Sequence, residues 1–258
     1  MFKNLLVVLL LLFGCCANAQ ERVFLIWGFT PGATTYNLFR ALAKEINEKQ
    51  NRYDIFVMDK QGAGGAIAAN YVLQNPQNNL YGASSTFFVR SHFNKESGYD
   101  VASFRPVSVP ATGAPLSVFC KNFNTIEDLK KSKDVTLSDS GVGSTFSLLT
   151  TVLQQHSPQV RMVHYGTNYL QTISDVMGGH IDCAWNWLSD VEERVQFGSG
   201  NIIGITGVRN IKKFRTFASQ GVPGLEKLTY VVLPEDVASL ETVAVTTCQI
   251  GRASCRER

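Results

Sequence analysis

The glycines Gly62, Gly64 and Gly65 lie close together at a change of pattern along the chain. An apolar, β-prone run at residues 53–58 precedes them and apolar residues at helical spacing follow them, so they are predicted to form a turn from a strand to a helix. Glycines there leave backbone N–H groups uncovered at the positive end of the helix, where an anion can be held. The stretch is a candidate for anion capture, although a single glycine-rich turn is more commonly a tight turn without a ligand.

Two further turns combine glycine with hydroxyl side chains at the start of a predicted helix. Residues 28–35 follow an apolar run at residues 22–27, and residues 139–145 follow one at residues 134–138. Helical spacing of apolar residues resumes after each turn. Three turns of this kind in one chain favour noncovalent capture of an anion over a merely structural role.

The elements that position these turns alternate between strand and helix. Successive strand–turn–helix units predict a parallel sheet whose turns gather at the carboxyl ends of the strands. We expect Thr34 or Thr35 to cap the first helix and Gly178 with Gly179 to close a helix over residues 170–177. The predicted strands cover residues 22–27, 53–58, 80–86, 115–120, 134–138, 160–164, 180–185, 201–206 and 228–233.

The predicted organisation is two α/β lobes of about 100 residues each, a normal domain size. The first lobe covers residues 20–118, the second covers residues 119–225, and residues 226–249 return to the first. A cleft between two such lobes is the default ligand site. Trp185, Trp187 and Tyr169 are candidates for lining this cleft, with core packing an equal alternative for each.

Both ends of the chain are expected to be foreign to the folded protein. Residues 1–19 predict a cleaved secretory signal peptide, with a lipoprotein linkage at Cys15 as the alternative. Residues 250–258 resemble the translation of a sequencing adapter, so we expect the natural sequence to be cut off near Cys248. Without these ends four of the 24 basic and one of the 21 acidic residues are lost. The near-neutral remainder gives no support to a nucleic-acid partner.

No pattern typical of an enzyme or a metal site occurs in the sequence. Cys120, Cys183 and Cys248 fit no metal-ligand spacing, and both one disulfide and buried free thiols remain open. The four histidines are scattered without ligand spacing. Ile67 stands where a dinucleotide-binding fingerprint needs its third glycine, and neither a phosphate loop nor a nucleophile elbow is present. We therefore expect no catalysis, no cofactor and no metal.

Five motifs in order, spread over residues 22–235, carry a resemblance to a known family. Three of them match at residues 59–65, 138–144 and 178–182, and of a fourth only Tyr165 and Gly166 remain. In the remaining one, the first loop, Phe29, Pro31, Gly32 and Arg40 match, whereas Thr30, Ala33 and Tyr36 replace Pro, Gly and Asp. Taken together they resemble the solute-binding proteins of tripartite tricarboxylate transporters, the Bug or TctC-like family.

The resemblance implies a periplasmic-binding-protein-like fold of type II, two α/β lobes that close on a ligand as a Venus flytrap does. It implies a monomeric periplasmic protein that captures a di- or tricarboxylate, or a similar small carboxylate, for the membrane components of such a transporter. Backbone amides and hydroxyls can hold a carboxylate because each charge-assisted hydrogen bond contributes about 1.5–3 kcal/mol. The expected ligand-binding residues are Phe29, Thr30, Pro31, Thr34, Thr35, Gly64, Gly65, Ala66, Thr86, Ser140, Gly143, Ser144, Thr145, Tyr165 and Asn168.

Other functions are open to the same fold. A ligand-sensing or orphan binding module without a transport role would carry the same two lobes. The ligand-sensing half of a transcription regulator shares the architecture too, but the predicted signal peptide and the lack of a DNA-binding helix pair argue against it. The family ordinarily continues with further helices that complete the first lobe, which agrees with a sequence cut short near Cys248.

Overall fold

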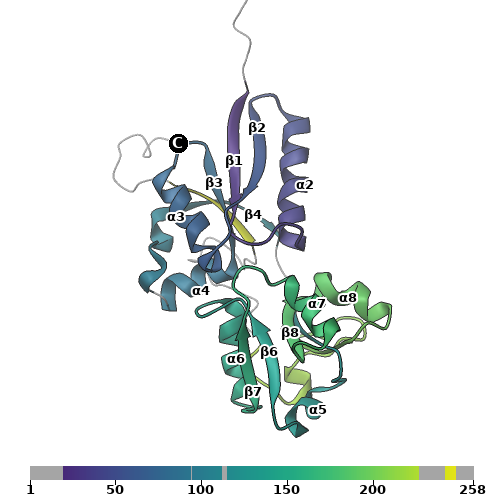
Figure 1. Cartoon of the computed structure of the whole chain (residues 1–258). Coiled ribbons are helices and arrows are strands. Elements are labelled where there is room, and N and C mark those ends of the chain that lie inside the picture. Colours follow the sequence, from purple (N-terminus) through teal and green to yellow (C-terminus); the bar gives the residue numbers. More distant parts are fainter. Residues whose placement is uncertain (1–19, 94, 112–114, 227–241, 248–258) are drawn as a thin grey trace, which may run out of the picture.

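The computed structural model describes residues 20–93, 95–111, 115–226 and 242–247. The predicted signal peptide with Cys15, the strand predicted at residues 228–233, Cys248 and residues 250–258 lie outside these ranges. The chain forms two α/β lobes, one above the other in Figure 1, each built on its own five-stranded sheet. Within the described part of the chain, no helix is long and apolar enough to span a membrane.

The first lobe holds a sheet in the strand order β2-β1-β3-β10-β4. Strand β1 pairs in parallel with β2 and β3, while β10 returns from the far end of the chain and lies antiparallel between β3 and β4. Both faces of the sheet carry helices, with α2 on one face and α3 and α4 on the other. The elements are β1 (Glu21–Trp27), α2 (Thr34–Lys49), β2 (Tyr53–Asp59), α3 (Ala66–Gln74), β3 (Asn79–Ser84), α4 (Ser85–Phe93), β4 (Phe104–Ala111) and β10 (Thr242–Thr247).

The second lobe holds a sheet in the order β7-β6-β8-β5-β9. Strands β6, β7 and β8 are parallel, whereas β5 lies antiparallel to both β8 and β9. Every residue of β5 is buried and paired in this sheet, so the chain has crossed between lobes before Leu116. The elements are β5 (Leu116–Cys120), α5 (Ile126–Lys131), β6 (Val135–Asp139), α6 (Thr145–Gln154), β7 (Val160–His164), α7 (Gln171–Gly178), β8 (Cys183–Trp187), α8 (Leu188–Gln196) and β9 (Asn201–Ile205).

Local chemistry accounts for the ends of several elements. Thr125 and Asp128 form a reciprocal capping box that starts α5. Gly179 adopts φ 76° and ends α7, as its sequence position predicts. A disulfide joins Cys120 at the end of β5 to Cys183 at the start of β8. The bridge settles the alternative that the sequence left open for these two cysteines.

Some predicted elements differ from the observed ones. Strand β2 has an apolar sequence but is half-exposed, because it lies at the edge of its sheet. The strand predicted at residues 80–86 ends at Ser84, and Ser85 with Thr86 opens helix α4, which the sequence did not predict. The predicted threonine cap of α2 is also wrong. The N-cap residue is Ala33, and no side chain near it in the sequence caps the helix.

Candidate ligand site between the lobes

A pocket lies where the two lobes meet, and each lobe contributes half of its wall. Its empty volume is about 340 Å³, counted with the open mouth. Among the residues that the structure describes, aromatic and hydroxyl side chains line it, and no Lys, Arg, His, Asp or Glu does. The first lobe supplies Trp27, Phe29, Ser84, Ser85 and Thr86, and the second supplies Ser140, Thr145, Phe146, Tyr169 and Trp187.

Several of these residues lie at the pocket because each of them ends a strand or directly follows one. Trp27 ends β1, Ser84 ends β3 and Trp187 ends β8, and Ser140 directly follows β6. Parallel strands bring their carboxyl ends to one edge of a sheet, so these side chains face the crevice between the lobes.

Two helices, one from each lobe, begin at the pocket. Ser85 and Thr86 open α4, and Thr145 opens α6. The Thr145 hydroxyl donates to Ser85 Oγ at 2.9 Å, and Thr86 Oγ1 lies 3.4 Å from both the backbone nitrogen and Oγ1 of Thr145. The positive ends of two helix dipoles thus meet at a cluster of hydroxyls. Such a cluster is suited to an anion held by hydrogen bonds.

The side chain of Asp190 in α8 reaches across to the start of α2 in the other lobe. Its Oδ1 accepts hydrogen bonds from the backbone N–H and the hydroxyl of Thr34. Burial raises the pKa of the Asp190 carboxyl above its usual 3.8, and the hydrogen bonds from Thr34 offset part of that rise. Asp190 therefore supplies from the second lobe the N-terminal cap that the sequence predicted from Thr34 or Thr35.

Thr30 makes a second contact between the lobes. Its hydroxyl donates to the carbonyl oxygen of Thr167 at 2.8 Å, and Oδ1 of Asn168 lies 3.4 Å from the same hydroxyl. The loop before α2 is thus tied to the loop after β7. Together with Asp190, these bonds fix α2 against the second lobe.

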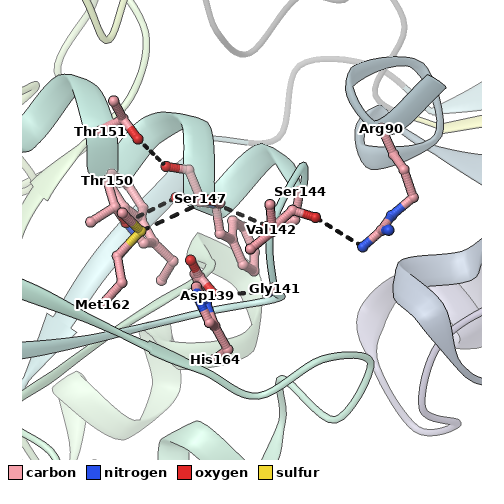
Figure 2. A network of polar contacts seen from close by, with 12 residues as sticks. Arg90, Asp139, Gly141, Val142, Ser144, Ser147, Thr150, Thr151, Met162 and His164 are labelled. Carbon is pink, nitrogen blue, oxygen red and sulfur yellow. Dashed lines mark hydrogen bonds and ion pairs between the residues drawn. The ribbon is translucent and has the colours of Figure 1, made fainter. Parts of the chain in front are cut away.

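Figure 2 shows the polar network behind the turn between β6 and α6. The fully buried carboxylate of Asp139 lies 2.5 Å from Nδ1 of His164 and accepts a bond from the N–H of Gly141. From the first lobe, Arg90 Nη2 donates to the carbonyl oxygen of Val142 at 3.0 Å. The turn that carries Ser140 is therefore held on one side by its own lobe and on the other by α4 (Figure 2).

The predicted ligand residues divide by location. Phe29, Thr86, Ser140 and Thr145 line the pocket. Thr30, Thr34 and Asn168 form the contacts between the lobes beside it. Thr35 lies buried in the first turn of α2, and Pro31 is half-buried in the loop before that helix.

The stretch that first suggested anion capture lies outside the pocket wall. Gly64 adopts φ +61°, and a Cβ there would fall 2.5 Å from the guanidinium of Arg90. Gly65 adopts φ +90° and packs on Phe29, while its carbonyl oxygen accepts from the hydroxyl of Tyr81. Ala66 is buried in the core that α3 forms with the sheet. A side chain at position 65 would therefore meet the buried residues Phe29 and Tyr81.

Three further predicted residues take structural roles. Ser144 is fully buried, and its hydroxyl accepts from the N–H of Ser147 as the N-cap of α6. Gly143 adopts φ +75° in the turn before that cap. The hydroxyl of Tyr165 donates to the carboxylate of Asp175 at 2.5 Å. Burial, and to a smaller extent this carboxylate, raises the pKa of Tyr165 to about 12. These residues shape the site's surroundings.

The sequence prediction missed Trp27, Ser84, Ser85 and Phe146 as pocket residues. The signal that finds three of them is their position at or next to the carboxyl end of a strand. Of the three candidates left open, Tyr169 and Trp187 line the pocket, whereas Trp185 is fully buried in the second lobe's core. Among the residues that the structure describes, no cluster of His, Cys, Asp or Glu could hold a metal ion.

Comparison with known proteins places this geometry in a fold. No protein-family model matches the sequence, and no curated protein matches it. Among solved structures, the periplasmic binding protein BugD superposes with a TM-score of 0.76 at 19% identity, over 92% of this chain and 79% of that one. The chain has the two-lobe fold of the periplasmic binding proteins. The predicted fold class is confirmed.

Two other periplasmic-binding-protein-like structures were solved with carboxylates. MatC from Rhodopseudomonas palustris, with bound malate, gives a TM-score of 0.74 at 15% identity, over 88% of this chain and 78% of that one. Rpa4515 from R. palustris, with adipate, gives 0.70 at 21% identity, over 88% and 75%. At these identities the likeness concerns the fold, and a function for this chain has to be argued from its own site.

Proposed function

We propose that this chain is an extracytoplasmic solute-binding protein that captures a small carboxylate between its lobes. The observation that carries the proposal is the meeting of the α4 and α6 N-termini, from different lobes, at one cluster of hydroxyls. A ligand that binds both helix ends links the two lobes, so binding and closure become one event. The arrangement performs capture and release without covalent chemistry.

The carboxylate would be held by neutral donors. Backbone N–H groups at the start of a helix lack a partner within that helix. At α6 the N–H of Thr145 lies 3.4 Å from Thr86 Oγ1 and that of Ser147 donates to Ser144, and the hydroxyls of Ser85, Thr86 and Thr145 meet at this point. The helix dipoles add their positive ends. The carboxylates in MatC and Rpa4515, which share the fold, support this choice of ligand class.

We place the protein in the periplasm and within the Bug or TctC-like family. The predicted signal peptide and the five sequence motifs support this placement, as does the fold shared with BugD. The closed lobes would present their joint surface to the membrane components of a tripartite tricarboxylate-type transporter. An exported protein whose first residue is Gln20 would agree with this location, and a lipid-modified Cys15 at the amino terminus would contradict the cleavage.

Calorimetric titration of the purified chain against a panel of small carboxylates tests the function, with sugars and free amines as controls. Thr145→Val removes the hydroxyl at the helix meeting point while keeping the side-chain shape, and we expect it to weaken carboxylate binding by about tenfold, or about 1.4 kcal/mol. Thr151→Val is the matched control, because its hydroxyl bonds only within the exposed side of the same helix. Equal affinities of the two variants would contradict the site, and no carboxylate binding at all would contradict the function.

A further inference from the structure

The interlobe pocket has an unusual balance of groups for a site that binds anions. Of the described residues that line it, half are aromatic and the other half carry aliphatic hydroxyls, and no cation is among them. The rings come from both lobes. Trp27 and Phe29 of the first lobe are tilted by 48° with centroids 5.1 Å apart, and Phe146 and Tyr169 of the second meet edge-on at 6.1 Å. A ligand inside is therefore bounded by apolar faces on both sides.

The positive charge available in the pocket matches one carboxylate. Each helix N-terminus acts as roughly half an elementary charge, and α4 and α6 both begin there. A second or third carboxylate on the same ligand would be buried with no cation among the described lining residues to pair with it. The neighbouring Asp190 strengthens this restriction, because its charge is the second cause, after burial, of a raised pKa at the pocket residue Tyr169.

Three buried polar atoms of the pocket residues have no hydrogen-bond partner among the residues the structure describes. They are Nε1 of Trp27, Oγ of Ser84 and Oη of Tyr169, on side chains that are more than nine-tenths buried. An indole N–H is a donor only. A buried donor without a partner is costly, so these groups indicate a ligand that brings an acceptor into the pocket.

We propose that the ligand is a small monocarboxylate with a flat apolar body, with benzoate as the simplest aromatic probe of that class. The carboxylate lies at the meeting of α4 and α6, and the flat body lies between the rings of the two lobes. This inference rests on the proposed function. It narrows the ligand class to monocarboxylates, in place of the di- and tricarboxylates that the family resemblance implies.

The affinities of four matched probes test the ligand class. The intact chain is titrated by calorimetry with benzoate, benzamide, succinate and citrate. We expect benzoate to bind at least tenfold more tightly than succinate and citrate, and benzamide, which has the same shape without the charge, to bind at least tenfold more weakly than benzoate. Tighter binding of succinate or citrate would overturn the inference and leave the proposed function intact. Equal binding of benzamide would overturn the carboxylate's role. Binding of none of the carboxylates would overturn both proposals.

A pair of tryptophan variants tests the geometry. Trp27→Phe keeps a ring in the wall but removes the unpartnered donor, so we expect about a tenfold loss of benzoate affinity beside the loss of Tm that shrinking a buried side chain brings. Trp185→Phe is the control, because its Nε1 donates to Thr150 in the core at 2.9 Å. We expect this variant to lose Tm and to keep its benzoate affinity. An unchanged affinity in Trp27→Phe would overturn the assignment of the indole donor to the ligand.

Discussion

Asp190 is the titratable residue through which pH most directly affects the contact between the two lobes. It lies in α8 of the second lobe, yet it caps α2 of the first. A carboxyl pKa raised by burial means that the folded state binds a proton more readily than the unfolded state. The stability contributed by the protonated form is fully present below pH 3.8, the ordinary value, and is lost as pH rises through the raised folded value.

Asp190→Asn should remove this pH dependence. The amide oxygen of asparagine still accepts from Thr34, but it carries no charge to desolvate. We expect the free energy of unfolding of the variant, measured by urea denaturation, to vary less with pH above 3.8 than that of the parent chain. Ser189→Ala is the control, since its hydroxyl donates to Thr34 Oγ1 without being titratable. A parent and an Asn variant with parallel pH profiles would show that the cap does not titrate.

At the scale of elements, the disulfide between β5 and β8 is a local device of the second lobe. It closes a sequence separation of 63 residues, so it restricts the unfolded chain considerably. It lies at the opposite end of β8 from Trp187, which lines the pocket. The bridge should therefore affect stability and leave binding alone.

The double variant Cys120→Ala with Cys183→Ala tests this separation of roles. We expect it to lose about 2–4 kcal/mol of unfolding free energy and to keep its ligand affinity. The same loss should follow when the parent chain is unfolded in a reducing agent, while the double variant should be insensitive to that agent. A parent chain whose stability does not respond to reduction would argue against the bridge.

Periodicity predicted most elements of the fold, including β7 with both of its ends and the close of α7 at Gly179. It failed for α4, in which Ser85 is followed by threonine, two phenylalanines and valine, residues that favour strands. Packing against the sheet outweighs that local preference. It also missed β4, because Pro106 and Pro110 are unusual within a strand.

The site was partly predictable for a related reason. Glycine and hydroxyl patterns locate turns, so they selected Thr86, Ser140 and Thr145, which line the pocket. They also selected Gly64 and Gly65, whose need for glycine comes from backbone conformation and close packing. The aromatic wall is invisible to such patterns, since a buried Trp27 has the same sequence signature whether it faces a core or a pocket.

For the whole molecule, polar contacts distributed along the interface hold the lobes together. Thr30, Thr34, Arg90 and Thr145 each bond across it, and the pocket lies among them. Contacts of this kind exchange readily with water, as expected for lobes that open and close. A ligand that joins α4 to α6 adds bonds to the closed arrangement alone and so shifts the population toward it.

The central claim is that a carboxylate binds where α4 and α6 meet, and a crystal structure of the chain grown with benzoate measures this most directly. The account predicts the carboxylate oxygens within hydrogen-bond distance of Ser85, Thr86 or Thr145, with the ring between the aromatic residues of the two lobes. A benzoate bound elsewhere on the molecule, with this meeting point filled by side chains or water alone, would contradict it.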